Sequence, residues 1–319
     1  MTATVIVPTA VGGARLVRLL ESLEDRGEGV EVLVVDNGAP DSAMDGLGAR
    51  FPGTTVIRLD RNWGYSRAVN LAAREASGDA LVLVNDDCVC DPGFVDTIVA
   101  PLDPGAGVTM VAGVMREARD RSRIDTAGME LDGTLLAFDY LNGEPVECLD
   151  HGVPDPVGPS GAAAAFDRES FLGLGGFDEN LFVYLEDVDL VLRMRREGGR
   201  CRLAPGAGGV HWHSSTLEPG SARKDYLMGF GRGYLLRKWG VLTLRRLPSV
   251  LARELAICAG QALVDRNLAG VRGRVTGLRS SPTPQPYPSE ALPSSTPTLA
   301  STLARRWRRR ARLRSTTSA

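Results

Sequence analysis

Short aliphatic runs alternate with segments of helical periodicity along the N-terminal part of the chain. The strand-like runs, rich in β-branched residues, lie at residues 4–7, 31–35, 55–59 and 80–84. Between them, residues 11–23 and 66–76 carry apolar side chains at helical spacing, and Ser66 is in position to cap the second of these helices. Strands that alternate with helices predict an α/β fold, in which a mainly parallel sheet has helices on both faces.

The middle of the chain has a less regular pattern. Residues 112–157 are irregular, with short strand-like pieces. A helix is predicted to begin near Glu186 and to end before Gly198. A strand at 210–213 and a helix at 222–238 are predicted to follow.

The C-terminal part changes in composition. A predicted amphipathic helix at 247–278 has arginines around apolar residues, so it could lie on a membrane surface or pack against the rest of the protein. The chain then becomes rich in Pro, Ser and Thr, as flexible linkers are, and ends in an Arg-rich tail. We therefore expect one domain over residues 1–240, a helical extension over 241–280, and a disordered linker and tail over 281–319.

Charge is distributed unevenly. The net formal charge is −2, yet seven arginines lie between Arg305 and Arg314, and the chain before Pro282 carries about −8. Sequence-specific nucleic-acid binding by the main body is therefore disfavoured. The tail could contact anionic lipids, bind nucleic acid without specificity, or be solvated. With 319 residues, 43% of them hydrophobic, the chain can bury a large core.

The cysteines and the N-terminus favour a cytoplasmic location, with peripheral contact at the inner face of the membrane as an open alternative. Five cysteines without a C-x-x-C pair are typical of free thiols, and Cys88 with Cys90 would make a poor zinc site. The first residues lack the basic and long apolar regions of a signal peptide. No run of 18 uncharged apolar residues is present, so no membrane-spanning segment is expected.

Polar residues follow the predicted strands, where open α/β sheets bind ligands. Asn85, Asp86 and Asp87 end the fourth strand. Adjacent carboxylates suit Mg²⁺ or Mn²⁺ bridging to substrate phosphates, although the same residues are common in turns. The glycine signatures of dinucleotide-binding and P-loop proteins are absent, which disfavours those classes.

Two further groups could carry chemistry. Glu186, Asp187 and Asp189 open a predicted helix, where acids also complement the helix dipole, so a structural role is open. His211 and His213 are two apart in a predicted strand and would point to the same side, as metal ligands could.

The ordered set of motifs resembles family 2 glycosyltransferases, and the sequences of these motifs are most similar to the bacterial rhamnosyltransferase-like branch of that family. The nucleotide-binding half is represented by Val35-Asp36-Asn37, by Arg61-Asn62-Trp63-Gly64-Tyr65-Ser66 with Asn70, and by Leu83-Val84-Asn85-Asp86-Asp87. The acceptor half is represented by Gly175-Gly176-Phe177-Asp178-Glu179, Phe182, Glu186-Asp187-Val188-Asp189-Leu190 and Arg193. The resemblance covers residues 4–240 and implies a GT-A fold, a Rossmann-like α/β/α sandwich.

The resemblance also implies a role for each matching residue. The base would be held by Asp36, and the nucleotide and its phosphates would lie against Pro8, Thr9, Asn37, Arg61, Asn62, Asn70, Asn85 and Asp86. Asp87 would ligate Mg²⁺ or Mn²⁺, with His211 as a further ligand, and Asp187 would be the catalytic base, flanked by Glu186. Asn85 replaces the first acid of the family's Asp-x-Asp metal motif, which removes one charge from the site.

These roles imply an inverting transfer from a nucleotide-diphosphate sugar to an acceptor hydroxyl. By resemblance the donor would be dTDP-rhamnose or a UDP-hexose. The acceptor would be a saccharide, a lipid-linked saccharide or a small molecule, in polysaccharide, glycolipid or secondary-metabolite synthesis. Two alternatives remain: a sugar nucleotidyltransferase, for which residues 9–15 only faintly resemble the Gly-rich loop, and a non-catalytic scaffold that binds sugar nucleotides.

Overall fold

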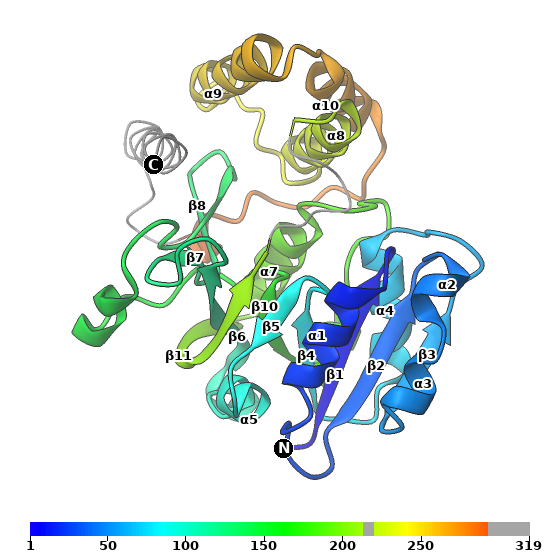
Figure 1. Ribbon diagram of the computed structural model, residues 1–319. Helices are drawn as coiled ribbons and strands as arrows, with labels where there is room; N and C mark the ends of the chain where they lie inside the picture. Colours follow the sequence, from blue (N-terminus) through cyan, green and yellow to red (C-terminus); the bar gives the residue numbers. More distant parts are fainter. Residues whose placement is uncertain (213–219, 293–319) are drawn as a thin grey trace.

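The computed structural model describes residues 1–212 and 220–292, and its centre is a nine-stranded sheet (Figure 1). His213 and the Arg-rich tail lie outside the described residues. The strand order is β3-β2-β1-β4-β10-β6-β11-β5, with β7 paired to β6. The strands of this sheet are β1 (Ala3–Thr9), β2 (Glu31–Asp36), β3 (Thr54–Arg58), β4 (Ala80–Val84), β5 (Cys88–Cys90), β6 (Val108–Glu117), β7 (Ile124–Thr126), β10 (Ala163–Asp167) and β11 (Arg200–His211).

The sheet is parallel in its N-terminal half and mixed beyond it. Strand β1 pairs in parallel with β2 and β4, and β2 with β3, as the alternating pattern predicts. Strand β10 then runs antiparallel to both β4 and β6, whereas β6 and β11 are parallel. Strands β4 and β10 are buried along their whole length, and a continuous apolar run carries no signal of strand direction. The α/β class is confirmed.

Helices cover both faces of the sheet and enclose two cores. One core packs α1 (Ala14–Ser22) and α5 (Phe94–Val99) against the sheet, through Leu16 and Ile98 among others. The other core packs the opposite face against α4 (Tyr65–Glu75), α6 (Arg168–Gly173) and α7 (Glu186–Arg196). The predicted three-layer sandwich is therefore confirmed. Short helices α2 (Asp41–Met44) and α3 (Leu47–Arg50) precede the edge strand β3.

The capping role predicted for Ser66 is wrong. Helix α4 begins at Tyr65 after Gly64, and the Ser66 hydroxyl donates instead to the carbonyl of Leu181. Gly64 has a φ of 91°, and a Cβ there would lie 2.5 Å from the Phe182 carbonyl oxygen. The start of α4 is thus shaped by contact with the 181–185 loop.

Three helices follow the sandwich: α8 (Ala222–Lys238), α9 (Leu247–Gly260) and α10 (Ala269–Arg279). A π-helical turn, η3 (Gln261–Asp265), extends α9. The single helix predicted over 247–278 is therefore interrupted, and Arg266, with a φ of 53°, lies at the break. Figure 1 shows the three helices as a group at the top of the molecule.

Helices α8 and α10 pack backbone to backbone through glycines. A Cβ on Gly229 would lie 2.2 Å from the Gly270 carbonyl oxygen, and one on Gly233 2.2 Å from that of Arg274. From α10, a Cβ on Gly277 would lie 2.1 Å from the Phe230 carbonyl oxygen. Only glycine fits at these positions.

One helix among the described residues is long and apolar enough to cross a membrane, judged by length and composition alone. It is Leu247–Asp265, 19 residues long, and 6% of its most apolar 18-residue window is buried. It contains the charged residues Arg253 and Glu254, so it is not a run of 18 uncharged apolar residues.

Candidate active site

A cavity of about 690 Å³ opens at the carboxyl ends of β1, β2 and β4. Its other walls come from α7, from the end of β11, from the first turns of α8, and from the hairpin of β8 (Met129–Leu131) and β9 (Ala137–Asp139). Most of the residues singled out in the sequence line it, namely Pro8, Thr9, Asn37, Asn62, Asn85, Asp86, Asp87, Glu186, Asp187 and His211.

Three residues assigned to the donor nucleotide lie outside this lining. Asp36 is buried at the end of β2, where its Oδ1 accepts a 2.9 Å hydrogen bond from the Ala39 amide. Arg61 stacks its guanidinium 3.7 Å from the centre of the Trp63 ring. Asn70 exchanges two hydrogen bonds with the Phe177 backbone, at 2.8 and 2.9 Å. Asn70 therefore positions the Gly176–Phe177 turn.

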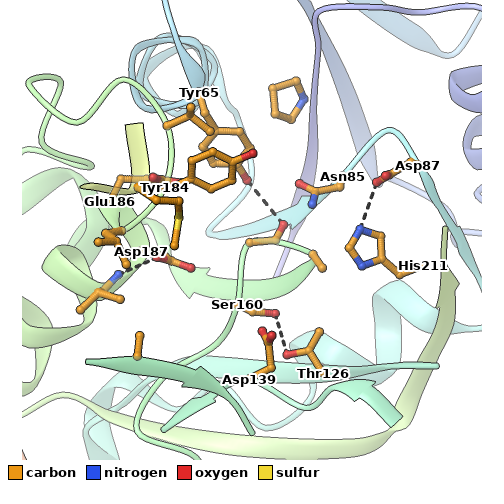
Figure 2. Close-up of a pocket in the computed structure, with 18 of the residues that line it drawn as sticks. Tyr65, Asn85, Asp87, Thr126, Asp139, Ser160, Tyr184, Glu186, Asp187 and His211 are labelled. Carbon is orange, nitrogen blue, oxygen red and sulfur yellow. Dashed lines mark hydrogen bonds and ion pairs between the residues drawn. The ribbon is translucent and has the colours of Figure 1, made fainter. Parts of the chain in front are cut away.

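Asp87, in the turn between β4 and β5, and His211, at the end of β11, meet on one side of the cavity (Figure 2). The His211 Nε2 atom lies 3.2 Å from Asp87 Oδ1, and its Nδ1 atom lies 2.9 Å from Asp125 Oδ2. Burial lowers the pKa of His211, but the hydrogen bonds to Asp125 and Asp87 outweigh burial and raise it to about 9.

This donor set fits a divalent cation, and its imidazole nitrogen suits Mn²⁺ better than Mg²⁺. A carboxylate oxygen and an imidazole nitrogen lie close together at a buried wall, and Asp125 holds the far side of the ring as second carboxylates do at histidine metal sites. The Cys88 thiol also lies near both groups. Its sulfur contacts the Ala162 carbonyl oxygen within the core, and burial raises the pKa of Cys88, which opposes thiolate ligation.

Asp86 has a different environment from Asp87. The Thr9 hydroxyl donates to Asp86 Oδ2 over 2.5 Å. Burial raises the pKa of Asp86 to about 6, and the Thr9 hydrogen bond acts in the opposite direction. The Thr9 oxygen also accepts from the Gly12 amide at 2.8 Å. Asp86 is thus joined to the loop after β1.

Glu186 and Asp187 lie on the opposite side of the cavity, in the first turn of α7 (Figure 2). The helix is preceded by two residues in the left-handed region, Tyr184 with a φ of 72° and Leu185 with a φ of 69°. Such backbone is costly for non-glycine residues and is common at functional sites. It turns the start of α7 toward the cavity.

Burial raises the pKa of Asp187 to about 6, with a further contribution from Asp139. Hydrogen bonds from the amides of Val188, 2.8 Å from Asp187 Oδ1, and Gly161 act in the opposite direction. Burial and the neighbouring Asp187 raise the pKa of Glu186 well above its usual range. The Glu186 Oε2 atom is buried and has no hydrogen-bond partner within the part of the chain that the structure describes.

Asp189, the third acid of this motif, has a structural environment. It is fully buried and pairs with Arg193 Nε and Lys238 Nζ, both at 2.8 Å, and with Trp239 Nε1 at 3.1 Å. These contacts join α7 to α8. The structural interpretation left open for the cluster therefore describes Asp189, whereas Glu186 and Asp187 line the cavity.

Several cavity residues had no signal in the sequence. Asp125 and Asp139 come from the segment whose sequence pattern is irregular, and Arg15 and Lys224 come from the first turns of α1 and α8. Lys224 Nζ lies 5.5 Å from the centre of the Tyr184 ring. A charged residue isolated in a polar stretch is ordinarily a surface residue, so only the folded arrangement shows that these groups converge.

The fold is that of GT-A glycosyltransferases. It is shared with GalNAc-T7, solved with UDP, GalNAc and Mn²⁺ (TM-score 0.60, 17% identity, 75% of this chain and 48% of that chain). It is also shared with the mannosyltransferase PcManGT of Pyrobaculum calidifontis, solved with GDP-Man and Mn²⁺ (TM-score 0.52, 20% identity, 88% of this chain and 76% of that chain). The chain thus spans slightly less than half of the GalNAc-T7 structure.

Residues 4–169 match the profile of Glycosyl transferase family 2, and the chain belongs to that family. It is 30% identical to N-acetylglucosaminyl-diphospho-decaprenol L-rhamnosyltransferase of Mycobacterium tuberculosis over 248 residues, 68% of this chain and 78% of that one. It is 28% identical to the O-antigen biosynthesis protein RfbC of Myxococcus xanthus, over 67% of this chain and 17% of that one. These relatives support the rhamnosyltransferase-like branch.

Proposed function

We propose that the protein is an inverting, metal-dependent glycosyltransferase whose catalytic domain comprises residues 1–240. The observation that carries this proposal is the placement of two unlike groups across one cavity. The Asp87–His211 pair lines one wall, and the carboxylate of Asp187 lines the other (Figure 2). A donor diphosphate at the first wall and an acceptor hydroxyl at the second would meet between them.

Asp87 and His211 would hold the metal. A bound Mg²⁺ or Mn²⁺ neutralises charge on the departing nucleotide diphosphate. The Asp87 carboxylate supplies an oxygen ligand, and His211 Nε2 becomes a ligand once its proton leaves. Asp125 keeps a proton on Nδ1, which directs Nε2 toward Asp87.

Asp187 would be the general base. Its pKa of about 6 leaves it ionised at neutral pH, yet basic enough to accept a proton from the attacking hydroxyl. One base and one direct displacement invert the anomeric configuration, by the logic that governs inverting glycosidases. Burial and the neighbouring Asp187 raise the pKa of Glu186 well above its usual range, which favours the neutral carboxyl, and a neutral carboxyl could donate to an acceptor oxygen.

The remaining polar residues would bind the donor. Pro8, Thr9, Asn37 and Asn62 line the cavity beside Asn85 and Asp86. Arg15 from α1 adds positive charge to the same cavity and suits phosphate oxygens. Asp36, Arg61 and Asn70 do not line the cavity, so we propose that they act on the nucleotide by supporting the loops that contact it.

The names of the relatives favour a rhamnose donor and a lipid-linked acceptor. We propose transfer from dTDP-rhamnose, with a UDP-hexose as the alternative, to a saccharide carried on a lipid in bacterial cell-surface polysaccharide synthesis. Such a reaction would take place at the cytoplasmic side of the membrane. No specific nucleic-acid partner is proposed.

The test is donor binding and slow hydrolysis of dTDP-rhamnose, UDP-galactose, UDP-glucose and GDP-mannose, with Mn²⁺ and with a chelator. We expect metal-dependent turnover of one donor, which is lost in Asp187→Asn while binding persists. Binding without turnover, even when lipid-linked and soluble acceptors are supplied, would instead support a non-catalytic scaffold. Absence of binding to every donor would refute the proposal.

A further inference from the structure

Helix α9 and the turn η3 direct several leucines outward, whereas Val250 of α9 is buried. Leu251, Leu255 and Leu263 are 49%, 67% and 80% exposed. Leu251 and Leu255 are four residues apart and lie on the same side of α9, and Leu263 follows on η3; we call these three exposed leucines the apolar stripe. Ala252, Ala256 and Ala259 are exposed beside it.

The charged side chains of α9 point toward the protein. Arg253 Nε donates to Asp132 Oδ2, between β8 and β9. Glu254 accepts from Arg232 Nε at 2.6 Å and from Arg274 Nε at 2.7 Å, on α8 and α10. A surface helix of a soluble protein ordinarily has the reverse arrangement, with its apolar side inward. Within the described residues, the apolar stripe is therefore not covered by other parts of the protein, as such a stripe normally is.

The charges around the stripe indicate what covers it. Arg245 precedes α9, Arg266 follows η3, and Arg272 lies on α10, and all three are exposed. Residues 241–280 contain seven arginines but only two acids, Glu254 and Asp265. In a two-fold dimer through this face, the arginines of both copies would approach one another. The chain's own tail, with seven arginines, is also like-charged. An anionic lipid surface complements both the apolar stripe and its cationic surroundings.

The inner side of the same helical unit is joined to the walls of the cavity. Gln261 Nε2 and Asn267 Nδ2 donate to the two carboxylate oxygens of Asp225, at 3.0 and 2.8 Å. Asp225 follows Lys224, which lines the cavity. Asp132, the partner of Arg253, directly follows β8 of the hairpin that forms another wall. A surface that holds α9 would thus also hold two walls of the cavity.

We propose that the apolar stripe inserts into an anionic bilayer surface, with α9 lying in the plane of the interface and the cavity held beside the lipid headgroups. Insertion across the bilayer would carry Arg253 and Glu254 into hydrocarbon and break their pairs with Asp132, Arg232 and Arg274, so the helix lies on the membrane. The inference deepens the proposed function, because it rests on an acceptor that is held at a membrane.

The direct test places a reporter in the stripe of the full-length chain. Leu255→Trp is mixed with vesicles of phosphatidylcholine and phosphatidylglycerol brominated on their acyl chains. The emission of the four native tryptophans is subtracted from the signal by means of the wild type. We expect the added emission to fall by about half, since an interfacial helix buries its apolar face at the headgroup–acyl boundary. Thr55→Trp, exposed on the edge strand β3, is the control and should be unquenched. Unquenched Leu255→Trp would overturn the proposal.

A second test measures affinity. Leu251→Glu, Leu255→Glu and Leu263→Glu are combined, and co-sedimentation with the same lipids at physiological salt should weaken at least ten-fold. The matched control combines Ser42→Glu, Ala49→Glu and Thr55→Glu, which add the same charge at exposed positions and should weaken binding much less. Equal losses in both variants would show that net charge alone drives binding and would overturn insertion. A wild-type dimer that only the leucine variant dissociates would show that a second copy covers the stripe.

Neither measurement uses a donor, an acceptor or turnover. Failure of vesicle insertion would therefore leave the proposed transferase activity standing. Failure to turn over any donor would in turn leave a positive quenching result standing.

Discussion

Asp125 Oδ2 lies 2.9 Å from His211 Nδ1, although 86 residues separate the two in the chain. The contact fixes which ring nitrogen faces Asp87, and it places a second carboxylate behind the proposed metal ligand. Replacement of Asp125 by Asn should weaken Mn²⁺ binding about 10- to 100-fold, the usual cost of losing such a partner. Titration of Mn²⁺ by calorimetry measures this without any turnover.

Cys88→Ala is the matched control for that measurement. The thiol is close to both ligands but packs in the core, so Mn²⁺ affinity should be unchanged. If Cys88→Ala weakened binding as much as His211→Ala, the thiol would be a ligand and the assignment above would be wrong.

Asp187→Asn should separate chemistry from binding. The amide cannot accept the acceptor's proton, so kcat should fall about 10²- to 10⁴-fold, the range for loss of a general base. The donor Kd should stay within about two-fold, because Asp187 lies across the cavity from the proposed diphosphate site. Single-turnover kinetics and donor titration check the two parts. A parallel loss of donor binding would indicate that Asp187 acts on the nucleotide instead.

The rate should depend on the ionisation of the same residue. A base works only when deprotonated, and the pKa of Asp187 is raised to about 6, so kcat/KM should rise with pH through about 6 and then level off. Glu186→Gln leaves the carboxyl group of Asp187 in place, so the rising limb should persist in that variant, with its midpoint unchanged or lower. A variant profile without this limb would assign the base to Glu186.

Asp189 should matter for stability rather than for chemistry. Asp189→Asn removes the buried carboxylate that pairs with Arg193, and it leaves Lys238 with Asp178 alone. Removal of one partner from a buried ion pair costs about 3 kcal/mol of unfolding free energy. Urea unfolding of Asp189→Asn measures this. Glu197→Gln, at an exposed acid just beyond the same helix, should change stability by less than about 0.5 kcal/mol. Equal effects of both substitutions would contradict this role.

The strands of the parallel half could be predicted from the local sequence pattern. The presence of Asp87, Asp187 and His211 at the cavity could be predicted from the family motifs. Asp125 and Asp139 could not, because they lie on short strands whose place depends on pairing β7 with β6 and β8 with β9, both set by tertiary contacts. The direction of a side chain is also invisible in a motif. Asp36 and Asn70 match the family motifs, yet neither lines the cavity and both form hydrogen bonds to neighbouring loops.

The glycine contact between α8 and α10 has a mechanical consequence. Where two helices touch through backbone atoms, no side-chain rotamer can absorb a small displacement, so movement of one helix moves the other. Lys224 is at the start of α8, and α10 follows the lipid-facing segment in the chain. A force applied to α10 from the outer surface would therefore displace the first turn of α8, with Lys224, directly. One added methyl group at Gly229, Gly233 or Gly277 would separate the helices and uncouple that turn from whatever holds the outer surface.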